Sequence, residues 1–186
     1  MNFNNHGDLQ GQHAYLSASS YHWVNYSDDK VAETYKKHLA TLMGTRLHAY
    51  AAECIELGQK LPKSNKTLNL YVNDCIGFRM TPEQVLYYSK YCFGTTDAIS
   101  FRDSKLKIFD LKTGMTPAHI EQLMVYDALF CLEYDVKPGD IQHELRIYQF
   151  DDKVIYGPTV DEIAHVMDRI VTADKIISQI NQEVNV

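Results

Sequence analysis

Apolar and polar residues alternate in two neighbouring stretches, Thr96–Phe101 and Lys105–Phe109, and the polar residues Arg102–Lys105 connect them. Alternation with a period of two is typical of β-strands, and a short polar connection commonly joins antiparallel strands. The pattern therefore predicts a β-hairpin. Glu83–Ser89 is rich in aromatic and β-branched residues and is predicted to pair beside this hairpin, while Ile141–Phe150 is predicted to extend the sheet.

Helical spacing of apolar residues begins after Ser27 and continues to about Gly58, a residue type that often ends helices. Two aspartates directly after Ser27 suit the positive end of a helix dipole. The pattern leaves open whether a break near Met43–Gly44 divides this stretch into two helices. Leu68–Val72 is compatible with a strand or with a short helix that continues to Ile76.

Two more helices are predicted after the hairpin. Thr116 and Pro117 have the residue types favoured at the N-cap and at the first helical position, and an apolar stripe continues from there to Leu132. Thr159 is predicted to cap a final amphipathic helix over residues 159–184. The apolar positions of this last helix need a partner in the same domain or in a neighbouring subunit.

Three charged residues are predicted to converge at one edge of the sheet. Asp97 and Asp110 are about equally far from the hairpin turn, so they should lie opposite one another, and Lys112 shares a face with Asp110. Two neighbouring carboxylates repel each other unless a cation lies between them, and carboxylate oxygens suit Mg²⁺ or Mn²⁺. The alternative is a polar hairpin whose charges are exposed to solvent.

These residues belong to four short motifs: Gly94-Thr95-Thr96-Asp97, Asp110-Leu111-Lys112, Gln122 with Tyr126, and Gly44 with His48. In this order they resemble the GxxD, (D/E)xK, QxxxY and GxxxH motifs of RecB-like nucleases. That family belongs to the PD-(D/E)xK superfamily, with phage lambda-type exonucleases and the nuclease of CRISPR spacer acquisition. The resemblance extends from about residue 16 to about residue 149.

The resemblance implies an α/β fold with the restriction-endonuclease-like core αβββαβ, a mixed central sheet flanked by helices. It implies that His48, Asp97, Asp110 and the Leu111 carbonyl hold Mg²⁺ or Mn²⁺. Lys112 would orient or deprotonate the attacking water, or stabilise the phosphate. The catalytic set implied by the motifs is Asp97, Asp110, Lys112, Gln122 and Tyr126, the last two sharing one helix face and positioning lysine, water or DNA backbone.

The function implied is metal-dependent hydrolysis of DNA phosphodiester bonds. The size of the chain resembles that of phage or prophage exonucleases of recombination or DNA end processing, some of which form toroidal oligomers. The implied partners are DNA and either a second copy of the chain or a recombination protein. Two alternatives remain: a DNA-binding or nuclease-inhibiting protein that kept the fold without turnover, and a small interaction module with a merely charged hairpin.

Several residues outside the four motifs are weaker candidates. Lys60, Lys63 and Lys66 recur every three residues in a loop and could contact phosphates or simply be solvated, and Arg146 could face the phosphate side of its strand. Glu53 could be an alternate or supporting carboxylate beside Asp97 and Asp110, and the resemblance implies a similar supporting role for Glu83, although both are compatible with an ordinary surface position. Trp23 or Tyr21 could stack on a base. We favour the alternative that these aromatic residues pack a short, serine-capped helix against the core.

Composition sets the outer limits. The 186 residues, 45% hydrophobic and 23% charged, predict one globular domain over residues 1–186 with a loose arm at residues 1–13, and the resemblance implies that it is a nuclease domain. No apolar run approaches 18 residues and the polar start is unlike a signal peptide, which predicts no membrane partner and a cytoplasmic location. The net charge of −6 argues against a generally basic DNA-binding protein. Four cysteines without CxxC spacing predict no iron–sulfur cluster.

Overall fold

The computed structural model describes residues 4–184, so the first three residues of the predicted arm lie outside the described part. The chain divides into two units, residues 1–42 and 43–186. The first unit contains two short 3₁₀ helices, η1 (Gly7–Leu9) and η2 (Ala18–Asn25), and the beginning of α1 (Asp28–Glu56). Ser17 caps η2 by accepting a hydrogen bond from the Ser20 N–H, as predicted, and the Trp23 indole donates to the Ser17 carbonyl.

The long helix α1 is continuous between its bounds, without the division near Met43–Gly44 that the sequence left open. Ser27 caps its start by accepting from the Lys30 N–H at 3.3 Å. At its end Gly58 adopts the left-handed conformation (φ 65°), and the next N–H returns to the Cys54 carbonyl at 2.8 Å. This arrangement satisfies the last carbonyls of the helix and ends it where the glycine predicts.

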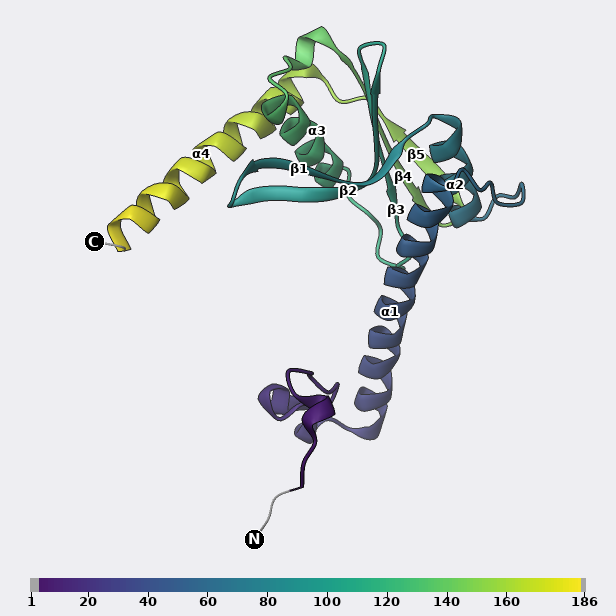
Figure 1. Ribbon diagram of the computed structural model, residues 1–186, viewed down its shortest axis with the longest axis vertical. Helices are drawn as coiled ribbons and strands as arrows, with labels where there is room; N and C mark the ends of the chain where they lie inside the picture. The colour runs from purple at the N-terminus through teal and green to yellow at the C-terminus, as the bar shows by residue number, and fades with distance from the viewer. Residues whose placement is uncertain (1–3, 185–186) are drawn as a thin grey trace. The chain divides into compact units, whose positions relative to one another are not determined.

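A five-stranded mixed sheet forms the centre of the second unit (Figure 1). The strands are β1 (Thr81–Ser89), β2 (Cys92–Arg102), β3 (Lys105–Leu111), β4 (Gln142–Gln149) and β5 (Asp152–Tyr156), and they lie in that order across the sheet. Neighbours pair antiparallel except β3 and β4, which are parallel because α3 (Glu121–Glu133) connects them. The first four strands confirm the prediction, whereas β5 was not predicted.

Helices cover both faces of the sheet, which gives an α/β architecture of three layers (Figure 1). One face packs against α2 (Thr67–Gly77) and the part of α1 after residue 43, so the ambiguous stretch after Lys66 is helical. The other face packs against α3 and α4 (Val160–Val184). The first core includes Ala51, Cys54, Tyr71, Val72, Cys75, Ala98, Phe109, Leu111 and Tyr148, and the second includes Leu86, Ile99, Leu106, Ile108, Leu123, Leu129, Leu145, Ile147 and Ile163.

The start of α3 differs from the prediction. The helix begins at Glu121 rather than at Thr116, and the preceding residues are irregular. The Gln149 side chain binds this segment: Nε2 donates to the carbonyls of Gly114 and Thr116, both at 2.8 Å, and Oε1 accepts from the Ala118 N–H at 3.1 Å. These contacts from β4 hold the backbone away from helical geometry, so the local capping signal is overridden.

The final helix α4 starts as predicted. Thr159 Oγ1 accepts from the Glu162 N–H at 3.3 Å, and the Glu162 carboxylate accepts from the Thr159 N–H at 2.7 Å. This reciprocal pair is a capping box. Over residues 4–184, none of the helices combines the length and the hydropathy required to cross a membrane.

A buried ion pair fixes β4 to α3. Asp127 and His143 are almost inaccessible, and His143 Nδ1 lies 2.8 Å from Asp127 Oδ2. The other ring nitrogen lies 2.9 Å from the Pro138 carbonyl. A carboxylate and a carbonyl can only accept here, so both ring nitrogens carry protons. Burial alone would lower the pKa of His143, but hydrogen bonds to Asp127 and Pro138 raise it above its ordinary value.

Removing one partner of this pair should destabilise the fold strongly. We expect Asp127→Ala to lower the free energy of unfolding by about 3–5 kcal/mol, because a buried imidazolium is left without its counter-charge. The matched control is Asp168→Ala on the exposed side of α4, which should change it by less than about 0.5 kcal/mol. Urea unfolding followed by circular dichroism measures both, and equal effects would contradict a structural role for the pair.

Candidate active site

The Asp97 carboxylate joins three elements at one end of the sheet. The register of β2 and β3 places Asp97 opposite Asp110, as predicted. Asp97 Oδ2 accepts a hydrogen bond from the Leu111 N–H at 2.8 Å, which extends the pairing of β2 with β3. Asp97 Oδ1 lies 3.3 Å from His48 Nδ1 of α1. Four of the predicted metal ligands therefore meet where β2, β3 and α1 converge.

Lys112 links this cluster to α3. Its backbone N–H donates to the Tyr148 carbonyl at 2.9 Å, which continues the β3–β4 pairing one residue beyond β3. Its Nζ donates to Asp110 Oδ1 at 3.1 Å and to Gln122 Oε1 at 2.9 Å. Gln122 Nε2 in turn donates to the Tyr126 hydroxyl at 3.4 Å. The predicted helix pair thus faces the charged cluster and holds its lysine.

Two glycines of the motifs mark places where chain segments approach too closely for a side chain. A Cβ on Gly94 of β2 would lie 2.8 Å from Tyr126 Cε1, and a Cβ on Gly44 of α1 would lie 2.8 Å from Thr113 Oγ1. Ordinary Cβ contacts are longer than 3.0 Å. Gly94 therefore allows Tyr126 to pack against β2, and Gly44 allows α1 to lie against the segment after Lys112.

Burial and neighbouring groups raise the pKa values of three titratable side chains in this cluster. Asp110 is only 4% exposed, and burial, with a smaller contribution from Asp97, raises its pKa to about 6 despite the nearby Lys112. A hydrogen bond with Asp97 raises the pKa of His48. Burial and repulsion by Asp97 also raise the pKa of Glu83, which lies near the same cluster on β1. Glu83 adopts φ 50°, an uncommon backbone conformation for a residue with a side chain.

The donor set suits a divalent cation. Lys112 Nζ lies 3.1 Å from both Asp110 oxygens, but only Oδ1 receives a hydrogen bond, and Oδ2 is buried without a hydrogen-bond partner in the described part of the chain. A buried oxygen of this kind is costly unless a proton or a cation occupies it. Among residues 4–184, no three His, Cys, Asp or Glu side chains are already gathered around one point. Asp97 contacts His48 and Asp110 contacts Lys112, so an ion would bind only with a rearrangement of these side chains.

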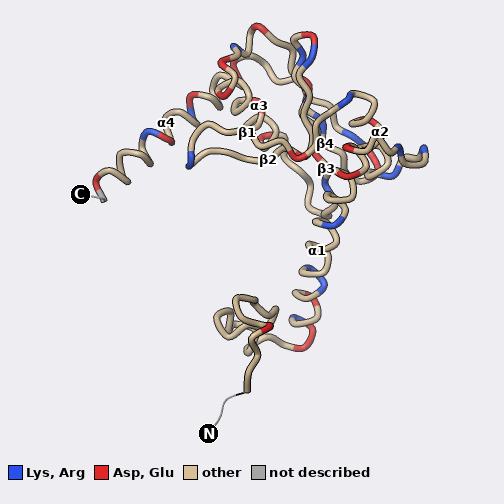
Figure 2. Tube along the Cα trace, viewed as in Figure 1, with Lys and Arg blue, Asp and Glu red and all other residues tan. Residues whose placement is uncertain are grey.

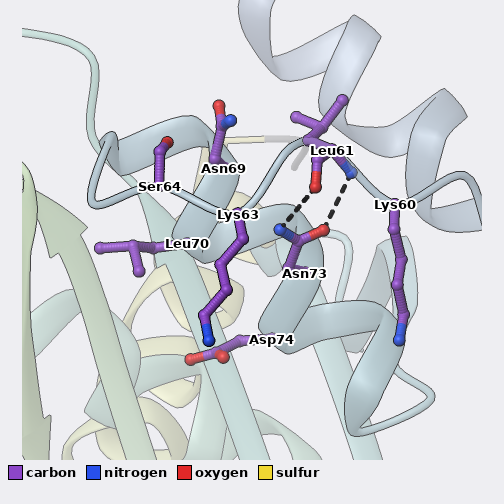
Figure 3. Close-up of a pocket in the computed structure, with 8 residues that line it drawn as sticks. All are labelled: Lys60, Leu61, Lys63, Ser64, Asn69, Leu70, Asn73 and Asp74. Atoms are coloured by element: carbon purple, nitrogen blue, oxygen red, sulfur yellow. Dashed lines mark hydrogen bonds between the residues drawn. The ribbon is translucent and has the colours of Figure 1, made fainter.

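Two of the predicted DNA-contacting lysines line a pocket. Lys60 and Lys63 extend from the loop between α1 and α2 beside a pocket of about 370 Å³ (Figure 3). Asn73 of α2 holds this loop, because its Oδ1 accepts from the Leu61 N–H at 2.9 Å and its Nδ2 donates to the Leu61 carbonyl at 3.0 Å. Both lysines therefore extend from a loop that is held in place.

The other two predicted DNA contacts are engaged in ion pairs. Lys66 Nζ lies 2.7 Å from Asp151 in an exposed pair. Arg146 is only 8% exposed, and its guanidinium lies 2.6 Å from Glu144, 3.1 Å from Asp74 and over two aromatic rings. These contacts occupy the buried Arg146 guanidinium within the protein. The prediction from the sequence was that Arg146 could face the phosphate side of its strand.

Sequence reasoning missed Gln149 and Thr113, both of which shape the segment between Lys112 and Gln122. No local signal marks them, because Gln149 acts on residues 31–35 positions earlier and Thr113 is defined by its distance from Gly44. Glu53, the weaker alternative, is exposed on α1.

Comparisons of the chain with protein-family models, with curated proteins and with solved structures give no match. The four motifs and the contacts between them are therefore the basis for a functional hypothesis.

We expect Gly94→Ala to lower the free energy of unfolding by about 1–3 kcal/mol, because the new methyl group overlaps the Tyr126 ring. In a Tyr126→Ala background the same change should cost much less, a coupling that a double-mutant cycle measures. Gly77→Ala is the control, since a Cβ at Gly77 meets nothing within 4 Å. Additive effects of the Gly94 and Tyr126 changes would disprove the contact.

Asp110→Asn should stabilise the metal-free protein at alkaline pH. Because the folded-state pKa of Asp110 is raised to about 6, wild-type stability falls as pH rises from about 4 past 6, and asparagine avoids this loss. At pH 8 with a chelator, we expect a gain of up to about 3 kcal/mol, and almost none at pH 4. Unfolding at both pH values with Asp168→Asn as control measures this gain. A less stable variant at pH 8 would contradict it.

Proposed function

We propose that this chain is a metal-dependent nuclease that hydrolyses phosphodiester bonds of DNA, with the αβββαβ core of PD-(D/E)xK enzymes. In this proposal the core consists of α1, β1, β2, β3, α3 and β4. One observation supports it above others. Lys112 Nζ lies between Asp110 and Gln122, so this lysine connects its own (D/E)xK motif with the QxxxY motif. An incidental polar hairpin would have no reason to bury Asp110 beside a second carboxylate.

The residues that would hold Mg²⁺ or Mn²⁺ are His48, Asp97, Asp110 and the carbonyl of Leu111. When bound, such an ion neutralises phosphate charge and lowers the pKa of coordinated water. Carboxylate and carbonyl oxygens suit both Mg²⁺ and Mn²⁺. The imidazole of His48 suits Mn²⁺ better than Mg²⁺, since imidazole favours transition metals. Both ions therefore need to be tested.

Within this site Lys112 is the residue that would act on the reacting groups. Its ammonium can stabilise negative charge on the phosphate as a compact point charge, or orient and deprotonate the attacking water. Gln122 fixes the position of Nζ by accepting its hydrogen bond, and Tyr126 supports Gln122 in turn. Lys60 and Lys63 could hold the DNA backbone at a distance from the reaction.

Among nucleases, we favour an exonuclease of the phage recombination type that acts on DNA ends, with DNA and further copies of the chain or a recombination protein as partners. The support is the set of RecB-like motifs. Figure 2 shows acidic and basic residues interspersed along α1 and α4, so neither helix is a wholly basic element.

The decisive experiment is a nuclease assay on end-labelled linear duplex and on closed circular DNA with Mg²⁺ or Mn²⁺. We expect cleavage of linear DNA only, reduced at least about 100-fold in Asp110→Asn and in Lys112→Ala, which remove transition-state electrostatics. The controls are Asp168→Asn and Lys175→Ala, two exposed positions on α4.

Full activity in Asp110→Asn or Lys112→Ala would refute the assignment. Binding of DNA or inhibition of another nuclease without any cleavage would instead support the fold without turnover. Cleavage of both substrates would show an endonuclease at the same site.

A further inference from the structure

A second charged pocket lies at the opposite end of β3 from the candidate active site. It has a volume of about 530 Å³ and is lined by the cationic side chains Arg79, Arg102, Lys105 and Lys107, and also by Phe78 and Asp103. Lys105 and Asp110 are five residues apart on β3, which corresponds to roughly 17 Å along the strand. The two sites are therefore distinct and share no residue.

Positive charge exceeds negative charge at this pocket. Glu144 is the carboxylate closest to the lysines, and Lys105 Nζ and Lys107 Nζ both approach its Oε2, at 2.6 Å and 3.9 Å. Its other oxygen, Oε1, is occupied by Arg146 at 2.6 Å. One carboxylate thus serves three cations. Because the net charge of the whole chain is −6, this excess is local and runs against the overall composition.

The two arginines add to the excess at the rim. Arg102 Nη2 donates to the Arg79 carbonyl at 3.1 Å, which links both residues, and Arg79 adopts φ 52°. Both side chains are exposed, and among residues 4–184 neither has a carboxylate within ion-pair distance. Asp103, also at the rim, provides one negative charge, and the C-terminus of α2 provides roughly half of one. Together with the shared Glu144, these negative charges do not balance the four cations.

Lys107 is a partly buried cation of this pocket that is repelled by its neighbours. Its side chain is 15% exposed and its Nζ lies 5.2 Å from the centre of the Phe78 ring. Burial lowers the pKa of Lys107, and repulsion by Lys105 and Arg146 lowers it further, although Glu144 opposes this. An anionic ligand would relieve this repulsion.

We propose that this pocket binds a ligand with two or more neighbouring phosphate groups. Its volume is typical of small-ligand sites, and arginine forks match phosphate oxygens in geometry and charge. Single carboxylates would leave part of the excess uncompensated. Adjacent phosphates occur in the polyphosphate of a nucleotide and along a nucleic-acid strand, and the chemistry of the pocket is the same for both. The inference uses none of the residues of the proposed nuclease site and does not depend on that function.

Calorimetric titration of the metal-free protein with inorganic pyrophosphate and with a ten-residue oligothymidylate tests the proposal. We expect at least one probe to bind, with its dissociation constant raised tenfold or more in the double variant Arg79→Gln/Arg102→Gln. These positions leave the Glu144 ion pairs intact, and the single variant Arg102→Gln is a milder second test. The charge-matched control is Arg169→Gln/Lys175→Gln at two exposed positions of α4, which should keep wild-type affinity for both probes.

The pattern of binding identifies the source of the phosphates. Pyrophosphate binding that depends on the arginines indicates a free polyphosphate, and oligothymidylate binding alone that depends on them indicates a strand. The proposal is overturned if neither probe binds, if the arginine variant binds both probes as tightly as the wild type, or if the Arg169→Gln/Lys175→Gln control loses as much affinity as the arginine variant.

Discussion

The carboxylate of Asp97 is the contact on which the candidate active site depends. It accepts the Leu111 N–H at the point where β3 ends, and it lies beside His48 on α1. A single side chain therefore sets the distance between the first helix of the second unit and the last residues of the hairpin. Lys112 makes the corresponding connection to α3 through Gln122. With these two residues in place, three elements that are far apart in the sequence are held around the end of one strand.

This arrangement lowers the stability of the second unit, and apolar packing elsewhere in the same unit offsets the loss. Asp110 is buried beside a second carboxylate, and a lone lysine does not offset both burial and repulsion. Two apolar cores, one on each face of the sheet, keep the strands rigid enough to maintain such a cluster. Strain of this kind is common where a fold is prepared for charged ligands, and it makes a site less stable than an apolar replacement would be.

The sequence predicts the local parts of this picture well. The hairpin, its register and the meeting of Asp97 with Asp110 follow from alternation and from the position of a turn, which act over a few residues. The start of α3 could not be predicted, because Gln149 binds that segment from a strand about 30 residues later. β5 was missed since its five residues have little apolar alternation of their own and form by pairing with β4. The burial of Arg146 was missed for a similar reason, because its partner Asp74 is 72 residues away.

The hydrogen bonds of the Gln149 side chain to the segment after Lys112 have an evolutionary consequence. Its three hydrogen bonds there are all with main-chain atoms, at Gly114, Thr116 and Ala118, so they do not depend on which side chains this segment carries. Met115, in the middle of it, is 84% exposed. The residues nearest to the cluster can therefore diversify, and change what they present to a substrate, while Lys112 and Gln122 on either side stay where they are.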